Sequence, residues 1–266
     1  MGKEITVQGH KIYVEIAGQG QPALFFHGVP DSAEIWDEVM AGVADRYTCY
    51  AADFQGVHRS AVDPKFSYTP DGYADWAEAL VTALDIREPV TLVVHDWGGG
   101  IGLAWACKYP QRIARVLAIN TVFTPGYRWH FWARVWRTPI LGELSMLLMN
   151  RFAMARMLRQ TSPGLSRERI ARMCAGAPAK LSTRWTWLRL YRSLDPQQLA
   201  GREEGLRALA EKVPIQVVWG ERDPFVPSWV ADTFFTKDVT HIPGCGHWVP
   251  AEAPDAVIRA LQNQPN

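Results

Sequence analysis

The sequence lacks the features that mark several large classes of protein. None of its apolar runs reaches the roughly 18 uncharged residues of a membrane-spanning helix, so we expect no transmembrane segment. Residues 1–6 contain no apolar core of the kind found in secretory signals. Only 4 of the 266 residues are cysteine, and none forms a Cys-x-x-Cys pair. Scattered cysteines of this kind are typical of a reducing compartment, and we expect a cytoplasmic protein.

Signatures of common cofactors and of nucleic-acid binding are also missing. No His/Cys cluster has the spacing of a metal site, and the glycines of residues 98–102 do not form a dinucleotide fingerprint in a first βαβ unit. No nucleic-acid-binding motif is recognisable either. We therefore expect no metal, no organic cofactor, no nucleic-acid partner and no membrane partner.

Charge is distributed unevenly along the chain, although the net charge is only +1. Residues 124–200 contain 13 Lys and Arg but only 3 Asp and Glu, whereas the remainder contains 15 and 24. This shift in composition marks a domain boundary. The basic segment is either a solvated helical face or docks on an acidic core, its own or that of a neighbouring copy in a homo-oligomer.

Outside the basic segment, short strands alternate with amphipathic helices. Residues 11–17 alternate between apolar and polar side chains, as a half-buried strand does, and residues 32–46 and 70–84 have helical spacing. Runs typical of buried strands occupy residues 23–26, 48–52, 90–94, 115–120, 214–219 and 239–242. About eight strands with interleaved helices predict an α/β fold with a doubly wound, mostly parallel sheet.

The basic segment itself contains helical patterns and no convincing strand. Trp129, Trp132 and Trp136 illustrate the spacing, which places apolar side chains on one side of a helix. We therefore predict an all-helical subdomain over residues 124–200, inserted into a core domain made of residues 1–123 and 201–266.

A strongly patterned motif lies at Asp96. The buried run at residues 92–94 leads through His95 to Asp96, and Trp97 and three glycines follow. Where a strand turns sharply into a helix, the turn residue projects its side chain, and small neighbours avoid a clash. The amides of the following helix favour negative charge there. Asp96 is therefore a candidate nucleophile, and the alternative is a plain N-cap ahead of Gly98.

Two further residues complete a constellation with Asp96. Asp223 follows the predicted strand at residues 214–219, and His247 follows the one at residues 239–242. The carboxyl ends of parallel strands meet at one edge of a sheet, where open α/β folds build their sites. We therefore predict that Asp96, His247 and Asp223 form a catalytic triad.

Together these motifs resemble the α/β-hydrolase superfamily, with Asp96 where esterases carry serine and with the family's order of nucleophile, acid and histidine. His27-Gly28-Val29-Pro30 resembles its oxyanion motif. The resemblance implies an α/β-hydrolase fold in which residues 124–200 form a helical cap. It also implies an oxyanion hole formed by the backbone N–H groups of Val29 and Trp97.

An aspartate nucleophile narrows the reaction. A carboxylate is already ionised at neutral pH and attacks a saturated carbon that carries a good leaving group, which gives an alkyl ester. His247, oriented by Asp223, then activates water to hydrolyse that ester. Haloalkane dehalogenases and epoxide hydrolases work in this way, whereas an esterase or lactonase is disfavoured. A catalytically inactive scaffold that binds a hydrophobic ligand is the alternative from another class.

Several residues favour the dehalogenase. Val94 precedes the nucleophile as in dehalogenases, and the Trp97 indole N–H is suited to a departing halide. Because Val29 replaces the asparagine that many dehalogenases use, the second donor must be a cap tryptophan. The candidates are Trp129, Trp132, Trp136, Trp185 and Trp187.

The segment from Trp129 to Trp132, which includes His130, resembles the halide-binding segment of fluoroacetate dehalogenases. Those enzymes hold a substrate carboxylate with arginines, and here the corresponding positions are Trp97 and Gly100. A small, neutral, apolar substrate is therefore expected.

Other residues favour an epoxide hydrolase, which needs a proton donor for the leaving alkoxide. Leu190-Tyr191-Arg192 resembles the segment that carries one such tyrosine, and Tyr127 is the candidate for a second. Asn120-Thr121 and Gly246-His247-Trp248 also resemble epoxide hydrolases. We favour the dehalogenase and keep the epoxide hydrolase as the alternative.

The loop at residues 53–60 departs from the family pattern. It resembles Asp-x-x-Gly-x-Gly-x-Ser, but His58 stands where the second glycine is usual. If that position needs a positive φ, histidine costs about 1 kcal/mol there, and otherwise the loop must follow a different course. No function is assigned to His58.

Overall fold

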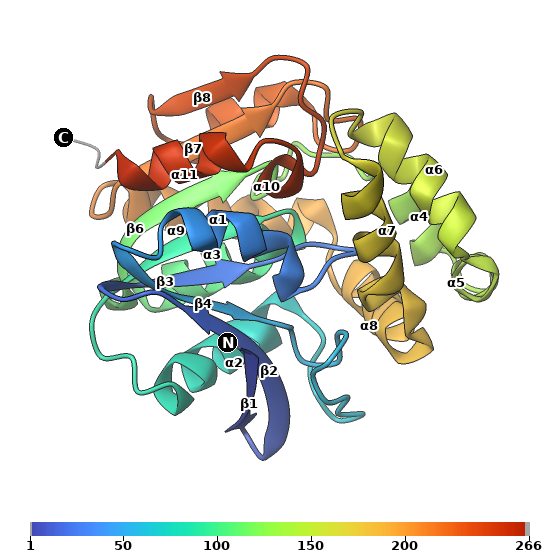
Figure 1. The fold of residues 1–266 in the computed structure, drawn as a ribbon, viewed down its shortest axis with the longest axis horizontal. Coiled ribbons are helices and arrows are strands. Elements are labelled where there is room, and N and C mark those ends of the chain that lie inside the picture. Colours follow the sequence, from blue (N-terminus) through green and yellow to red (C-terminus); the bar gives the residue numbers. More distant parts are fainter. Residues whose placement is uncertain (1, 264–266) are drawn as a thin grey trace.

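An eight-stranded sheet forms the centre of the molecule (Figure 1). The computed structural model of the protein describes residues 2–263. Its strands are β1 Gly2–Val7, β2 His10–Ala17, β3 Gln21–Phe26, β4 Tyr47–Ala52, β5 Val90–His95, β6 Ile113–Ile119, β7 Ile215–Gly220 and β8 Val239–Ile242. They lie in the order β1-β2-β4-β3-β5-β6-β7-β8. Only the β1–β2 and β2–β4 pairs are antiparallel, which confirms the predicted mostly parallel sheet.

Helices cover both faces of the sheet. On one face lie α2 Pro70–Ala83, α3 Trp97–Lys108 and α9 Ala200–Ala210, and on the other lie α1 Asp37–Gly42 and α11 Pro254–Gln262. The side chains of β5 alternate between the two resulting cores: Leu92 and Val94 enter the first, and Val93 enters the second. This alternation follows from the two-residue period of a strand. It explains why a strand buried on both faces is apolar throughout.

The predicted helix over residues 32–46 is shorter in the structure. It consists of the 3₁₀ turn η1 Ala33–Trp36 and then α1, which ends at Gly42. The backbone N–H groups of Arg46 and Tyr47 both donate to the Val43 carbonyl, and this turn redirects the chain into β4. The remaining short helices are η2 Pro110–Arg112, η3 Ala177–Ala179, η4 Pro196–Leu199, η5 Ser228–Phe234 and α10 Val249–Glu252.

Besides α9, five longer helices lie between β6 and β7, as the predicted helical insertion requires. They are α4 Phe131–Arg137, α5 Leu141–Leu148, α6 Arg151–Thr161, α7 Arg167–Ala175 and α8 Leu181–Ser193. Figure 1 shows them packed together beside one end of the sheet. We call this group of helices the cap. No helix within residues 2–263 is both long and apolar enough to cross a bilayer.

The basic cap is held on the core of its own chain. Arg169 Nη1 lies 3.4 Å from Glu38 Oε1, and its Nη2 donates to the Ile35 carbonyl at 2.9 Å. Lys180 donates to the His58 carbonyl at 2.6 Å, and Thr183 Oγ1 accepts the His58 N–H at 2.9 Å. The uneven charge distribution therefore serves, in part, to dock cap on core.

His58 occupies the left-handed region of backbone space, with a φ of 48°. The loop thus keeps the backbone course for which glycine is usual, and the strain is offset by the contacts of His58 with Lys180 and Thr183. The imidazole of His58 also lies 3.6 Å from Glu34. His58 is a point at which the cap is attached.

Candidate active site

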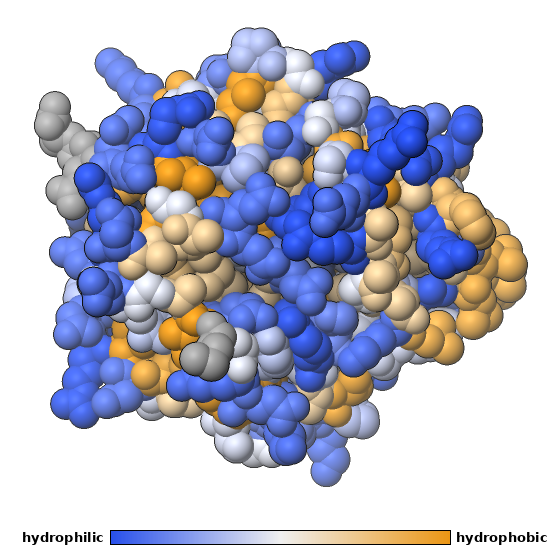
Figure 2. All heavy atoms as spheres, in the orientation of Figure 1, coloured by the Kyte–Doolittle hydropathy of each residue, from blue (hydrophilic) through white to orange (hydrophobic). Residues whose placement is uncertain are grey.

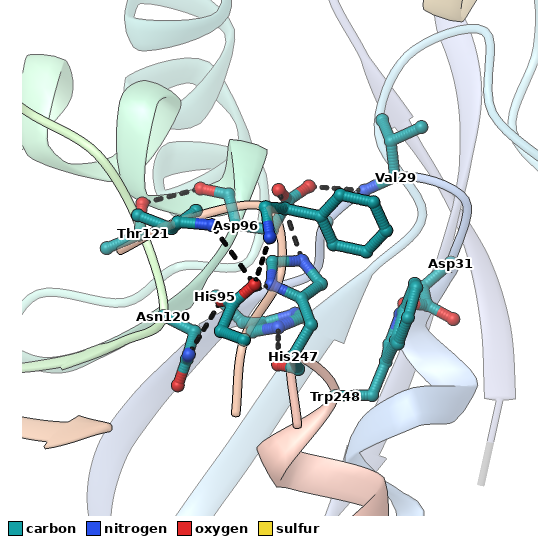
Figure 3. Close-up of polar contacts among 12 residues, drawn as sticks. Val29, Asp31, His95, Asp96, Asn120, Thr121, His247 and Trp248 are labelled. Carbon is teal, nitrogen blue, oxygen red and sulfur yellow. Dashed lines mark hydrogen bonds and ion pairs between the residues drawn. The ribbon is translucent and has the colours of Figure 1, made fainter. Parts of the chain in front are cut away.

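Asp96 lies at the sharp turn between β5 and α3, with a φ of 51° and a ψ of −124° (Figure 3). The Asp96 carbonyl is fixed by Thr121 Oγ1 at 2.6 Å and by the Gly99 N–H at 2.9 Å. A Cβ at Gly98 would lie 2.2 Å from the Phe26 carbonyl oxygen, so the turn excludes larger residues there. The Asp96 side chain caps no N–H group of α3. The simple N-cap interpretation is therefore wrong.

Each oxygen of the Asp96 carboxylate has its own partner. Oδ1 accepts the Val29 N–H at 2.8 Å, and Oδ2 lies 3.4 Å from His247 Nε2. Burial by itself would raise the pKa of Asp96, but the hydrogen bond and the charge of His247 outweigh it and lower the pKa to about 2. The carboxylate is therefore ionised at neutral pH although only 15% of its side chain is exposed.

His247 lies between two carboxylates. Its Nδ1 is 2.7 Å from Asp223 Oδ2, on the side of the ring opposite to Asp96. Burial alone would lower the pKa of His247, but the charges and hydrogen bonds of Asp223 and Asp96 raise it well above its usual range. With both carboxylates ionised, the ring is an imidazolium. If either carboxylate loses its charge, the pKa of His247 falls.

Asp223 is in turn fixed by backbone and side-chain donors. Its Oδ1 accepts the N–H groups of Phe225 at 2.7 Å and Val226 at 3.0 Å. Its Oδ2 accepts Asn120 Nδ2 at 2.7 Å. Asn120 follows β6 and is itself held, because its Oδ1 accepts the Gly220 N–H at 2.8 Å. The structure thus places the three predicted triad residues in one hydrogen-bonded chain.

Sequence reasoning did not identify the pair Asp31 and Trp248. Trp248 Nε1 donates to Asp31 Oδ2 at 2.7 Å, and the Trp248 ring meets the His247 ring edge-on, with centroids 4.9 Å apart. Burial raises the pKa of Asp31 to about 7. The Trp248 hydrogen bond lowers this pKa and the charge of Asp96 raises it further, but burial is the larger effect. Asp31 directly follows Val29-Pro30, and this position beside the predicted oxyanion motif is the sequence feature that could have drawn attention to it.

His95 was likewise not predicted to have a role. Its Nε2 lies 2.9 Å from the His247 carbonyl, and Figure 3 shows it directly beside that loop. Burial and the neighbouring His247 charge lower the pKa of His95 to about 4. It is therefore neutral and donates to the carbonyl, which positions the histidine loop.

A cavity of about 360 Å³ opens in front of Asp96 and His247. Its walls are mostly apolar and come from both core and cap. They include Val29, Pro30, Trp132, Trp136, Leu148, Met149, Met154, Met157, Tyr191, Phe225 and Trp248. No Lys or Arg is among the described residues that line it. The space therefore suits a neutral, apolar molecule.

A smaller cavity of about 40 Å³ adjoins Asp96 on the other side of His130 and Tyr191. Trp97 and Trp129 both line it, with their rings stacked at a centroid distance of 5.8 Å. Trp129 Nε1 is buried and has no hydrogen-bond partner within the described part of the chain. A cavity of this size holds one or two small groups, such as a water or a monatomic ion.

The other predicted leaving-group residues differ in their positions. Tyr191 and His130 line both cavities. Tyr127 lines only the small one, and its hydroxyl donates to the Phe225 carbonyl at 3.0 Å. Trp132 and Trp136 line only the large one, whereas Trp185 and Trp187 line neither, so the prediction that either of those two reaches the site is wrong. Amphipathic spacing does not show which cap tryptophan turns toward Asp96.

His130 is neutral in this setting. Its Nδ1 accepts the Ala133 N–H at 3.2 Å and so caps α4, which leaves Nε2 as the protonated nitrogen. Burial lowers the pKa of His130 to about 4, opposed by the charge of Asp96. No group of three His, Cys, Asp or Glu residues within residues 2–263 is arranged to hold a metal ion.

The chain is similar to several known proteins. The sequence pattern of the family described as alpha/beta hydrolase fold matches residues 22–254. The chain is 27% identical to a cis-3-alkyl-4-alkyloxetan-2-one decarboxylase of Shewanella oneidensis, over 97% of this chain and 86% of that one. It is 34% identical to a haloalkane dehalogenase of Sphingobium indicum, over 46% of this chain and 43% of that one.

Among solved structures, the epoxide hydrolase CorEH superposes with a TM-score of 0.78 at 19% identity, covering 98% of this chain and 96% of that one. At this identity the superposition shows a shared fold. The sequence relatives include a dehalogenase and a decarboxylase, and the fold is shared with an epoxide hydrolase, so similarity by itself does not select a substrate.

Proposed function

Because the chain belongs to the α/β-hydrolase fold family, we propose that it cleaves the carbon–halogen bond of a small, neutral, apolar substrate through an ester on Asp96. One observation carries this proposal. A half-buried, ionised carboxylate faces an apolar cavity and adjoins a smaller one, in which the buried Trp129 Nε1–H has no partner among residues 2–263.

In the first step, Asp96 Oδ2 attacks the carbon that bears the halogen. The new C–O bond forms as the C–halogen bond breaks, and its electron pair leaves with the halide. The apolar cavity strips water from the carboxylate and holds the alkyl group near it. No proton is needed in this step, since a halide is a stable anion.

The two stacked indoles supply the site for that anion. Trp97 and Trp129 both line the small cavity, and an indole N–H is a donor with no acceptor capacity. A buried N–H without a partner costs about 1–3 kcal/mol, so an anion that accepts from Trp129 Nε1 is favoured there. Asp96 lines this cavity as well as the larger one, so a leaving group that separates from carbon at Asp96 can enter it.

In the second step, water hydrolyses the ester. Once Asp96 is esterified, His247 retains only Asp223 as a charged partner, so its pKa falls and the ring releases its proton to solvent. The neutral ring then accepts a proton from the attacking water. The hydroxide attacks the ester carbonyl, whose oxygen accepts the Val29 N–H. The alcohol leaves, the Asp96 carboxylate is restored, and His247 is left as the imidazolium of the resting site.

Epoxide hydrolysis is the second candidate, and Tyr191 is the observation that favours it. Burial, with the charge of Asp96, raises the pKa of Tyr191 well above its usual range, so the phenol keeps its proton. Tyr191 lines both cavities beside Asp96 and is placed to donate to an alkoxide. Tyr127 is less suited to this role, because its hydroxyl already donates to a backbone carbonyl.

Trapping the ester tests both candidates. His247→Ala removes the base, so the ester accumulates. Intact-protein mass spectrometry then measures the mass that the ester adds to the protein. A bromoalkane adds the alkyl group and releases bromide, whereas an aryl epoxide adds its whole mass. A dialkyl oxetan-2-one is the third substrate to be tested, because the name of the Shewanella relative contains this ring.

The control is the double variant Asp96→Ala/His247→Ala, which must stay unmodified. An adduct from the bromoalkane supports dehalogenation, and an adduct from the epoxide alone assigns epoxide hydrolysis. If no substrate leaves an adduct that depends on Asp96, the covalent mechanism is wrong and an inactive ligand-binding scaffold remains.

A further inference from the structure

The cap carries an exposed apolar face that its fold does not need. We define the cap face by six exposed side chains on and beside α5, namely Ile140, Leu141, Leu144, Leu147, Leu148 and Phe152. Figure 2 shows apolar surface gathered at the end of the molecule formed by α5. Contiguous apolar surface on a water-exposed helix marks an interaction site.

The solvent-exposed side of α5 is more apolar than the side that packs against the rest of the cap. Its buried side consists of Gly142 and Met146, which face the rest of the cap. Leu144 and Leu148 are one turn apart on the outer side, and Leu148 is 74% exposed. An amphipathic helix that only served the fold would carry polar residues at these positions.

The large cavity opens through the cap face. Trp132, Leu148 and Ala153 line the cavity and are also exposed at the surface. Leu148 belongs to the cap face and to the cavity wall at once. A molecule that enters along this face therefore reaches Asp96 without crossing the core.

Exposed arginines on α4 and α6, the helices that precede and follow α5, have no carboxylate partner within residues 2–263. Arg134, Arg151 and Arg156 are exposed, and none of them forms an ion pair with any residue in the described range 2–263. Arg151 lies over the Phe152 ring, with its Cζ 5.1 Å from the centroid. The one acidic residue of α5, Glu143, is already paired with Arg192. The apolar face is therefore bordered by uncompensated positive charge.

From this arrangement we propose that the cap face docks on the surface of an anionic phospholipid bilayer. The leucines and Phe152 enter the interfacial region, and the flanking arginines contact lipid phosphates. An apolar substrate dissolved in the lipid then enters the cavity directly. This substrate route rests on the proposed function, whereas the docking itself does not.

The positive charge beside the cap face favours an anionic bilayer over a second copy of the chain as its partner. Two cap faces in contact would bring like-charged arginines together, with no free carboxylate on α5 to pair with them. An anionic bilayer supplies the missing charge. The expectation of no membrane partner rested on the absence of a spanning helix, and docking at a surface needs none.

Co-sedimentation of the full chain with vesicles tests the docking. We expect binding to phosphatidylcholine vesicles that contain phosphatidylglycerol, little binding to phosphatidylcholine alone, and weaker binding as salt is added. Leu144→Asp should weaken binding roughly tenfold or more, because a leucine no longer enters the interface. Arg151→Gln should weaken it roughly fivefold.

Matched controls lie on the core domain. Val62 is 43% exposed and Leu144 is 48% exposed, so Val62→Asp makes the same kind of change away from the cap face. Arg259→Gln is the corresponding control for charge, since Arg259 is exposed on α11. Both controls should bind like the wild type. Leu144 does not line the cavity, so Leu144→Asp should leave lipid-free turnover unchanged.

Three results would overturn the proposal. The wild type could stay in the supernatant with anionic vesicles, or Leu144→Asp could bind as well as Val62→Asp. Alternatively, analytical ultracentrifugation without lipid could show a dimer that Leu144→Asp converts to monomer, which would make the face a self-association surface. Asp96→Ala should bind vesicles like the wild type, so failure of the proposed chemistry and failure of docking are separate outcomes.

Discussion

Asn120 Nδ2 and His247 Nδ1 both lie 2.7 Å from one atom, Oδ2 of Asp223. The amide therefore fixes the oxygen that orients the imidazole. Because Asn120 is itself held by the Gly220 N–H, the backbone of β7 contributes to the position of the histidine. This relationship makes Asn120 a positioning residue for the proposed ester hydrolysis.

We expect Asn120→Ala to slow the second step more than the first. Loss of a hydrogen bond to a charged oxygen costs about 1.5–3 kcal/mol, which corresponds to roughly 10- to 150-fold in the rate of ester hydrolysis. Rapid-quench mass spectrometry should show the Asp96 ester accumulating, with the rate of alkylation nearly unchanged. Equal slowing of both steps would show that Asn120 acts through general stability.

Trp129→Phe should weaken the proposed halide site, because it removes the Nε1–H and keeps the ring. We expect a roughly 10- to 100-fold loss in kcat/KM for a bromoalkane, with weaker inhibition by added bromide. Trp187→Phe is the matched control, since Trp187 Nε1 is also buried without a partner but lines neither cavity. Equal losses in the two variants would remove Trp129 from the site.

Asp31 should make the stability of the protein fall as pH rises through the neutral range. Its folded pKa of about 7 lies above that of an unfolded carboxyl, so the folded state binds more protons between these two values. Stability is therefore greatest at the acid end and is lost toward neutral pH, by about 1.4 kcal/mol per pH unit between roughly pH 5 and 6.5.

Asp31→Asn should remove that dependence while its side-chain oxygen still accepts the Trp248 N–H. Urea unfolding of both proteins across this pH range measures the difference. Parallel stability curves for wild type and variant would show that Asp31 is ionised throughout.

The turn at Asp96 should tolerate alanine at one glycine and not at another. A Cβ at Gly98 would lie 2.2 Å from the Phe26 carbonyl oxygen, whereas the nearest atom to one at Gly100 is 3.8 Å away. We expect Gly98→Ala to lower the free energy of unfolding by about 1–3 kcal/mol or more. Gly100→Ala should raise it by up to about 1 kcal/mol, because alanine favours helix. Thermal unfolding monitored by circular dichroism compares the two.

Local sequence patterns were sufficient for much of the fold. The period-two runs and helical spacings predicted the parallel sheet and the helical insertion, because burial of one helix face or of whole strands imposes those patterns. The run from His95 to Gly98 likewise indicated a sharp turn, since only small residues fit beside it. The positive φ at His58 was also foreseen as one of two alternatives, as it follows from the backbone course of the loop.

Other features depend on segments far apart in the chain. Asp31 and Trp248 are 217 residues apart and Asn120 and Asp223 are 103 apart, so no local pattern connects them. Trp129 and Trp187 were both candidate halide donors from the predicted cap, yet only Trp129 lines the small cavity. Which side of a helix faces the site depends on how the cap helices pack, and periodicity does not specify that.

The sequence by itself determined the order of the candidate catalytic residues along the chain and the strands that they follow. A carboxylate lies at a strand-to-helix turn, and an acid and a histidine come after two later strands. Only the tertiary structure decided which charges meet, which indole borders the small cavity without a partner among residues 2–263, and which leucines stay exposed. The reason is physical, since hydrogen bonding, burial and the pKa shifts that follow from them depend on distances in space, and the packed chain sets those distances.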